Sequence, residues 1–185
     1  MTPFITAKEE KLVKACLNKD RQAQRQLYNQ YVRAMYHLAM RMVTDASKAE
    51  DIVQESFIKV FQYLNNYKGD ATLGAWIKRI TINTCLSHLR KAERLVFTDN
   101  FNEQIPARES QVKTSSKNQL NKIHAAIKEL PTGSRTVLTL HLLEGYQHQE
   151  ISEILGITVS TSKTQYRRGR LLLQKILKEK YKLTY

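Results

Sequence analysis

The sequence has few of the residues that make tight turns, with 6 Gly and 3 Pro among 185 residues. A chain rich in β-strands needs many such turns, and glycine and proline are prominent in them. Their scarcity therefore argues against a β-rich protein. Long stretches of Leu, Ile, Lys, Arg and Gln favour helices instead. We predict an all-α fold.

Cysteines and long apolar runs are also scarce. Cys16 and Cys85 are too few and too far apart for a zinc site or a disulfide framework, and their apolar neighbours indicate packed thiols. No apolar run approaches the roughly 20 residues that a membrane span needs. Residues 1–10 show no signal-peptide pattern. We expect a cytoplasmic protein with no membrane insertion.

Patterns typical of enzymes are missing as well. The five histidines and the scattered carboxylates show no spacing typical of metal ligands or of a catalytic triad. His148, close to Glu150, is more simply interpreted as the start of a helix. The sequence therefore predicts no enzyme activity, no metal and no cofactor.

Positive charge, by contrast, is in excess: Lys and Arg number 30 against 17 Asp and Glu, a net charge of +13. Residues 1–95 carry 16 basic and 9 acidic side chains, and residues 96–185 carry 14 and 8. A surplus of this size attracts polyanions, of which nucleic acid is the commonest. Because both halves share the surplus, both are candidates for phosphate contact. On charge alone, a merely basic soluble protein stays an alternative.

Apolar residues recur at helical spacing in two stretches separated by a polar one. Residues 1–94 predict a first helical domain. Residues 95–117 are rich in Asn, Gln, Ser and Lys without periodicity, which is typical of a flexible linker. Residues 118–185 predict a second helical domain.

Several helix ends are predicted from single residues. Asp45 or Ser47 is suited to cap the third helix of the first domain, and the fourth is expected to start near Trp76. In the second domain, Ser134 is expected to cap a helix that Gly145 closes in a left-handed conformation.

Residues 149–164 match the spacing of a helix-turn-helix. Gly156 permits the tight turn, Ile157 fills the corner, and Thr158 caps the second helix. On that helix we expect polar and basic side chains to face DNA: Ser160, Thr161, Lys163, Thr164, Arg167, Arg168 and Arg170. Arg167 or Arg168 is suited to bidentate reading of guanine, and Lys163 and Arg170 to phosphate contact. Gly169 costs this helix about 1 kcal/mol relative to alanine.

The first domain distinguishes between kinds of DNA-binding protein. Residues 49–61, which include Asp51, Gln54 and Glu55, resemble the region-two helix of bacterial sigma factors. That resemblance implies that these three side chains contact the core polymerase. Without it, each would be interpreted as part of a solvated helix face.

Residues 67–84 are similar to the promoter-melting loop and helix of the extracytoplasmic-function (ECF) group of sigma factors. Opening a duplex needs a pocket for an unstacked base and cations along the exposed strand. The resemblance implies contacts with the melted element from Tyr67, Lys68, Gly69, Asp70, Lys78, Arg79, Asn83 and Arg90. Trp76 is expected to anchor the loop from below rather than to stack on a base.

The resemblance covers about residues 20–92 and 118–178, and the absence of a further helical domain between them is typical of the ECF group. It implies promoter recognition and melting as the function, with core RNA polymerase and promoter DNA as partners. Members are often held inactive by an anti-sigma protein, so such a partner is implied too. The alternative is a stand-alone helix-turn-helix regulator, which leaves residues 51–61 and 67–83 unexplained.

Overall fold

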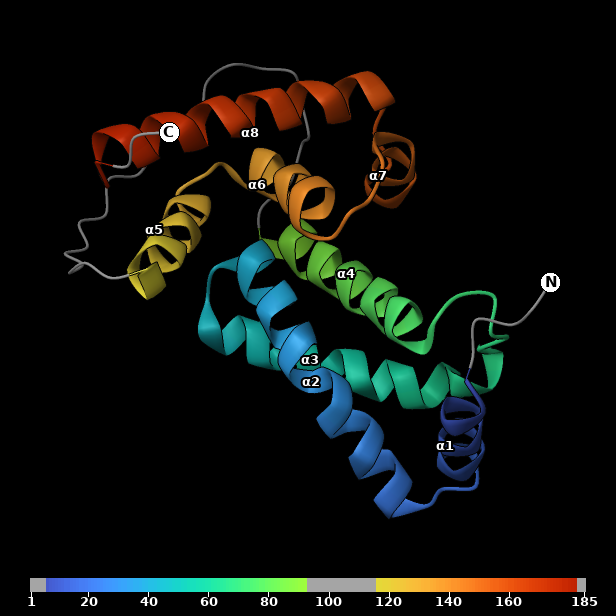
Figure 1. Cartoon of the computed structure of the whole chain (residues 1–185). Coiled ribbons are helices and arrows are strands. Elements are labelled where there is room, and N and C mark those ends of the chain that lie inside the picture. The colour runs from blue at the N-terminus through green and yellow to red at the C-terminus, as the bar shows by residue number, and fades with distance from the viewer. Residues whose placement is uncertain (1–5, 93–115, 183–185) are drawn as a thin grey trace. The chain divides into compact units, whose positions relative to one another are not determined.

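The computed structural model describes residues 6–92 and 116–182, which belong to two compact units, residues 1–93 and 94–185. All regular elements in these described ranges are helical (Figure 1), so the prediction of an all-α chain with two helical units is confirmed. The linker predicted at 95–117 lies outside the described residues except at its end, where a helix already begins at Ser116.

The first unit is built from three long helices and two short elements. In chain order these are α1 (Ala7–Leu17), α2 (Arg21–Val43), α3 (Ala46–Tyr63), the 3-10 turn η1 (Leu64–Asn66) and α4 (Leu73–Ala92). Helices α2, α3 and α4 pack on one another, while α1 packs on α2 and on η1. The apolar stripes of the three long helices meet in a core in which Leu27, Ile52 and Ile77 are fully buried.

Side chains at the helix starts explain two of the boundaries. Asp45 accepts a hydrogen bond from the Lys48 amide at 3.1 Å, which confirms it as the cap of α3. Helix α4 begins at Leu73, earlier than predicted from Trp76, because Thr72 Oγ1 accepts a hydrogen bond from the Ala75 amide at 3.2 Å. Such a bond satisfies an amide that has no partner within the helix.

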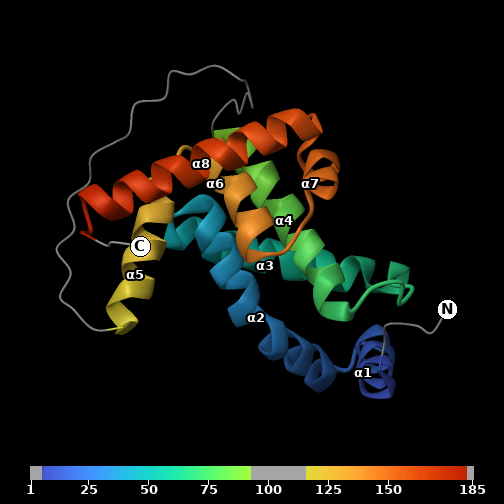
Figure 2. The same cartoon turned by 45° about the horizontal axis from the view of Figure 1, so that its top comes forward.

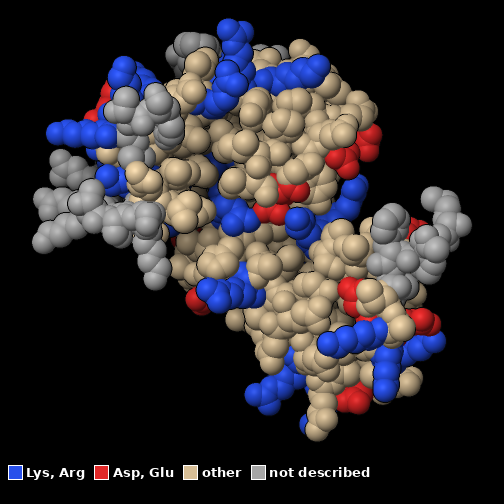
Figure 3. All heavy atoms as spheres, in the orientation of Figure 1, with Lys and Arg blue, Asp and Glu red and all other residues tan. Residues whose placement is uncertain are grey.

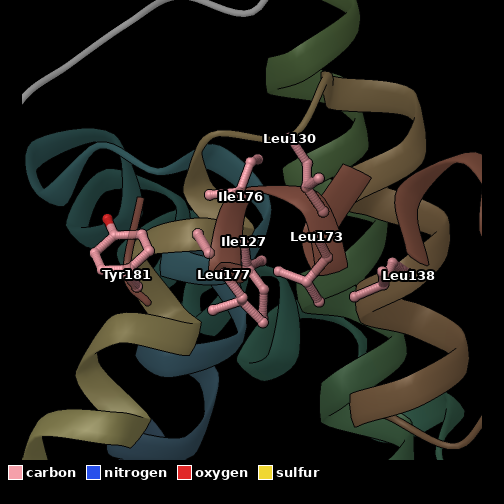
Figure 4. Close-up of a cluster of buried hydrophobic side chains, with 8 residues drawn as sticks. Ile127, Leu130, Leu138, Leu173, Ile176, Leu177 and Tyr181 are labelled. Atoms are coloured by element: carbon pink, nitrogen blue, oxygen red, sulfur yellow. The ribbon is translucent and has the colours of Figure 1, made fainter. Parts of the chain in front are cut away.

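The second unit is arranged around one long helix. Its elements are α5 (Ser116–Lys128), α6 (Thr132–Leu138), the π-helical continuation η2 (Thr139–Leu143), α7 (His148–Leu155) and α8 (Val159–Glu179). Helix α8 packs against α5, α6 and α7 (Figure 2). The labelled side chains of the resulting core are Ile127, Leu130, Leu138, Leu173, Ile176, Leu177 and Tyr181 (Figure 4).

The prediction that Ser134 caps α6 is wrong. The helix starts after Pro131, whose carbonyl oxygen accepts a hydrogen bond from the Arg135 amide at 2.8 Å. Proline cannot continue a preceding helix but suits the start of a new one, so it sets this boundary. Ser134 lies inside α6, is buried, and donates a hydrogen bond from Oγ to Gln165 Oε1 at 2.7 Å. Gly145, by contrast, has φ +80° as predicted.

Cys16 and Cys85 are buried free thiols, as the sequence indicated. Burial raises the pKa of the Cys85 thiol to about 12 and also raises that of Cys16. Because the reactive species is the thiolate, both thiols are inert packing groups at neutral pH.

Candidate nucleic-acid interface

The turn between α7 and α8 has the geometry of a helix-turn-helix. Gly156 ends α7 with φ +69°, a backbone conformation that a side chain would strain. Ile157 is half-buried in the corner, and Thr158 Oγ1 accepts a hydrogen bond from the Thr161 amide at 3.0 Å. The roles predicted for Gly156 and Thr158 are therefore confirmed, and α8 starts in a defined direction.

The amino-terminal half of α8 presents the predicted side chains in two environments. Ser160, Lys163, Arg167 and Arg170 are exposed, whereas Thr161, Thr164 and Arg168 are half-buried. Figure 3 shows Lys and Arg side chains standing out at the top of the view, where Figure 1 places α8. Arg168 has an intramolecular partner, so the fully exposed members are the better candidates for direct DNA contact.

Gly169 has a packing role that its low helix propensity does not reveal. A Cβ atom there would lie 3.1 Å from the Ser134 carbonyl oxygen and 3.3 Å from Leu138 Cδ1. The glycine therefore lets α8 approach the backbone of α6 closely, and α8 continues without a break to Glu179.

Polar and aromatic side chains of other elements contact the side of α8 that does not face solvent. His148 Nδ1 lies 2.9 Å from the buried Ser162 Oγ, and the ring of His148 stacks on that of His141 with centroids 4.3 Å apart. Tyr166 meets both rings edge-on, at 4.7 Å from His141 and 5.6 Å from His148. Burial lowers the pKa of His148, with further lowering by His141 and Lys163. These residues were not predicted, because they come from three separate elements.

In the first unit, the loop between η1 and α4 is closed by its own contacts. Tyr67 donates a hydrogen bond from its hydroxyl to the Ala71 carbonyl at 2.7 Å, and its ring lies 5.5 Å from that of Trp76. Gly69 is buried with φ +77°. Trp76 is half-buried at the base of the loop. The loop therefore has a defined shape before any ligand binds.

The remaining side chains predicted to contact melted DNA lie on the loop and on α4. Lys68 and Asp70 are exposed on the loop. On α4, Arg79, Asn83 and Arg90 are exposed and follow one another at intervals of about one and two helical turns, which places them on one face. Lys78 is half-buried beside them.

The three residues predicted to contact polymerase all lie on α3 but differ in their environment. Asp51 and Gln54 are exposed on α3. Glu55 is instead engaged within the unit: its carboxylate lies 2.7 Å from Lys59 Nζ and 2.7 Å from Nε2 of His88 on α4. Hydrogen bonds from His88 and then Lys59 lower the pKa of Glu55. Glu55 thus ties α3 to α4.

Beside Gln54 the surface has a shallow hollow of about 400 Å³ between α2 and α3. Its lining consists of Tyr28, Val32, Arg33, Tyr36, Glu50, Val53 and Gln54. The α2 members were not predicted as functional residues. The signal was present, because Tyr28, Val32 and Tyr36 recur at intervals of four and so share one face of a helix.

Within residues 6–92 and 116–182, no cluster of three His, Cys, Asp or Glu side chains is able to hold a metal ion. Over the same ranges, no helix is both long and apolar enough to cross a bilayer.

The two units define a class of protein, a helical DNA-binding protein in which the helix-turn-helix is only one of two functional parts. The family model for sigma-70 region 2 matches residues 27–95, and that for sigma-70 region 4 matches residues 120–173. The chain belongs to the sigma-70 family of RNA polymerase sigma factors, within its ECF group. Since the region 2 match covers the part that a stand-alone regulator leaves unexplained, that alternative is set aside.

Two bacterial sigma factors are similar to this chain over nearly their full length. The RNA polymerase sigma-H factor of Pseudomonas aeruginosa is 30% identical, with 91% of this chain and 93% of that protein covered. The ECF RNA polymerase sigma factor SigW of Bacillus subtilis is 29% identical, with 92% and 97% covered.

Solved structures share the fold. CnrH, in complex with the cytosolic domain of CnrY, gives a TM-score of 0.56 at 21% identity and covers 91% of this chain and 96% of its own. The sigma factor RpoE of Bartonella quintana, in complex with the anti-sigma factor NepR, gives 0.58 at 24% identity and covers 84% and 97%.

Proposed function

We propose that this sigma factor holds promoter DNA at two separate places. The exposed basic face of α8 binds the upstream element as a duplex, and the loop of residues 67–72 with α4 binds the downstream element after melting. Like its family, the protein acts as an initiation factor within the polymerase, and its proposed location is the cytoplasm. The observation that carries this proposal is the capped α8, with Lys163 and Arg167 exposed on its amino-terminal half.

The upstream contact follows from the dimensions of B-DNA. Its major groove admits an α-helix, and in a helix-turn-helix the first residues of the second helix reach base edges. Ser160 and Thr164 are small enough to permit close approach, while Arg167 has the length and the paired donors to read guanine. Lys163 and Arg170 are suited to the flanking phosphates.

The downstream contact needs different chemistry, because a melted strand offers flexible phosphates and unstacked bases. Lys68 provides positive charge on the loop, and Arg79 and Arg90 provide it on one face of α4. Asp70 on the loop and Lys78 on α4 are proposed to contribute to the same contact, and Tyr67 and Gly69 shape the loop that is proposed to receive a base. Asn83 offers an amide for a base edge. Cations that follow the backbone, together with a pocket for a base, are the usual means of holding single-stranded DNA.

Docking on core polymerase is proposed for the surface formed by Asp51, Gln54 and the adjoining hollow. Tyr28 and Tyr36 give the hollow an aromatic lining, and Gln54 is one of its polar lining residues. Asp51 is exposed on the same helix as Gln54. Aromatic pockets with polar rims are typical of protein interfaces. Glu55 is proposed to support this surface by holding α3 against α4.

Two single substitutions in the polymerase holoenzyme test the division between the two DNA contacts. Arg167→Ala should weaken the closed complex by about 1–3 kcal/mol, the usual cost of losing a base-reading arginine. Asn83→Ala should leave the closed complex unchanged but reduce promoter opening, measured by permanganate reactivity of unpaired thymines. If both variants impair both steps to the same degree, the division is wrong.

An anti-sigma protein is a further partner that we propose on family membership. RpoE of Bartonella quintana is bound to such a factor in its structure. A protein that co-purifies with this chain and blocks its binding to core polymerase would support the proposal. Co-purification of core polymerase alone would count against it.

A further inference from the structure

Helix α8 is held to its neighbours by polar side chains on its inward face. Ser162 and Gln165 are both buried there, about one turn apart. Ser162 Oγ lies 2.9 Å from Nδ1 of His148 on α7. Gln165 Oε1 accepts a hydrogen bond from Ser134 Oγ on α6 at 2.7 Å. Because hydrogen bonds are directional and apolar packing is not, these two contacts fix how far α8 is turned about its own axis, and with it the direction of the exposed basic face.

The ring of His148 is itself seated on two other rings. It stacks on His141 with centroids 4.3 Å apart and an interplanar angle of 17°, and Tyr166 of α8 meets both rings edge-on. His141 is fixed in turn, because its Nδ1 donates a hydrogen bond to the Tyr146 carbonyl oxygen at 2.8 Å. It belongs to the π-helical segment η2, and π-helical turns occur frequently at functional sites. The three rings and Ser162 thus join η2, α7 and α8.

The surroundings of the His148 ring disfavour a positive charge on it. His141 stacks on it from η2, Tyr166 meets it from α8, and the charge of Lys163 on α8 also acts on it. On its own helix, Glu150 is two residues away and therefore on a different side, and its carboxylate accepts a hydrogen bond from the backbone amide that precedes α7 at 2.7 Å. Burial lowers the pKa of His148, and His141 and Lys163 lower it further. The ring is therefore hard to protonate while it stays in its place.

We infer that His148 is a positioning residue for α8, which it holds through Ser162 while its own ring is uncharged. The inference rests on the proposed role of α8 in binding the upstream element. His148 does not contact DNA in this account and acts only on the direction in which α8 presents Lys163 and Arg167. A protein whose binding-competent state is only partly populated binds more weakly in proportion. Loss of this contact, by substitution or in mild acid, should therefore weaken upstream binding.

The test measures the affinity of the closed complex, with the holoenzyme and a duplex promoter fragment that the wild type uses. Ser162→Ala and His148→Phe each remove one partner of the hydrogen bond, and phenylalanine keeps a ring against His141. At neutral pH each variant should weaken the closed complex about fivefold, the usual net effect of one hydrogen bond. The double variant should lose no more than either single one, because both act through the same contact.

Ser152→Ala is the matched control. Ser152 is a buried serine of α7 whose hydroxyl donates a hydrogen bond to the Gln149 carbonyl oxygen of its own helix at 2.6 Å. This variant should bind as the wild type does. Circular dichroism at the temperature of the assay should show wild-type helix content in every variant. A merely structural role of His148 would lower the melting temperature but leave the affinity of the folded protein unchanged.

The pH profile tests whether the ring must be uncharged. A histidine ring that is free in water has a pKa of about 6.5, and the pKa of His148 in its place is lower. The contribution of His148 is therefore complete above about 6.5 and is lost as the pH falls through the lower value. The ratio of wild-type affinity to that of Ser162→Ala or His148→Phe should fall from about fivefold at neutral pH toward one in acid. This ratio cancels titrations elsewhere in the holoenzyme.

Wild-type affinity in Ser162→Ala and His148→Phe would overturn the inference, and so would an equal loss in Ser152→Ala. A ratio that stays constant in acid would also overturn it. A ratio that rises would do the same, since the protonated ring would then itself attract DNA. Arg167→Ala is measured beside these variants. If it does not weaken the closed complex, the proposed function of α8 fails, whereas a loss in Arg167→Ala alone places the failure in the positioning contact.

Discussion

A Cβ atom at position 169 would meet the Ser134 carbonyl oxygen at 3.1 Å and Leu138 Cδ1 at 3.3 Å. The first of these is a backbone atom in the middle of a helix and cannot turn aside. The helix propensity of glycine predicts that Gly169 weakens α8, yet the packing shows that it allows the two helices to touch. Helix α8 also carries the proposed DNA-binding side chains. Its close contact with α6 therefore helps to hold those side chains in position.

Gly169→Ala should therefore destabilise the second unit on the order of 1 kcal/mol, since overpacking outweighs the gain in helix propensity. Urea denaturation followed by circular dichroism measures the loss, and Trp76 fluorescence reports the first unit separately. Gln174→Ala, at an exposed position of the same helix, should change stability by less than about 0.5 kcal/mol. Stabilisation by Gly169→Ala would contradict the packing argument.

Residues with a local role were predictable from the sequence, and residues with a distant partner were not. Thr158 and Gly156 act on amides and backbone angles within three residues, so their types and spacing were sufficient. Ser134 has a polar side chain near a helix start, which suggested a cap, but its partner is Gln165, far along the chain. Similarly, nothing in the spacing of His141 and His148 indicates that their rings stack.

At the scale of elements, α3 and α4 are joined by one carboxylate. Glu55 contacts Lys59 on its own helix and His88 on α4, each at 2.7 Å, and Lys59 also donates to Thr84 Oγ1 of α4 at 3.3 Å. The family resemblance had assigned Glu55 to polymerase contact together with Asp51 and Gln54. These contacts suggest a second role for Glu55, which is to hold α3 in place against α4, and its contact with polymerase stays a prediction.

Glu55→Gln should lower the stability of the first unit at pH 7, by no more than about 1 kcal/mol because the side chain is partly exposed to solvent. Since the folded state lowers the pKa of Glu55, its contribution is complete above the unfolded-state pKa of about 4.3. It is lost as the pH falls through the lower folded-state value. The gap between variant and wild type should therefore close in acid.

Urea denaturation followed by Trp76 fluorescence at pH 7 and at lower pH gives this comparison. Glu50→Gln is the control, since Glu50 is exposed on the same helix. A gap that stays constant across the acid range would show that the ion pairs of Glu55 do not contribute as described.

The helices themselves were largely predictable, because apolar periodicity reflects which face each one buries. The start of α6 was misplaced, and its π-helical continuation through Leu143 was not foreseen. Apolar periodicity predicts neither feature. The start of α6 is set by Pro131. The π-helical segment differs from an α-helix in its backbone hydrogen bonds, which the spacing of apolar residues does not show. The hollow between α2 and α3 was also missed, because it depends on two helices that pack side by side.

At the scale of the whole molecule, the chain consists of two units, and each unit has a hydrophobic core of its own. Membership of the sigma-70 family identifies the chain as a polymerase-binding initiation factor. The surfaces of the two units suggest which unit makes which contact. The second unit presents a helix suited to duplex DNA, and the first presents a shaped loop, a basic helix face and a candidate docking hollow.

The most direct test of this account is run-off transcription on fragmented genomic DNA of the source organism, with its core polymerase. Adding the wild-type protein should produce discrete transcripts that core polymerase alone does not make. A variant with both Asp51→Ala and Gln54→Ala should lose them while retaining its fold. A wild-type protein that directs no transcripts would contradict its role as an initiation factor. A double variant that directs them as well as the wild type does would contradict docking through Asp51 and Gln54.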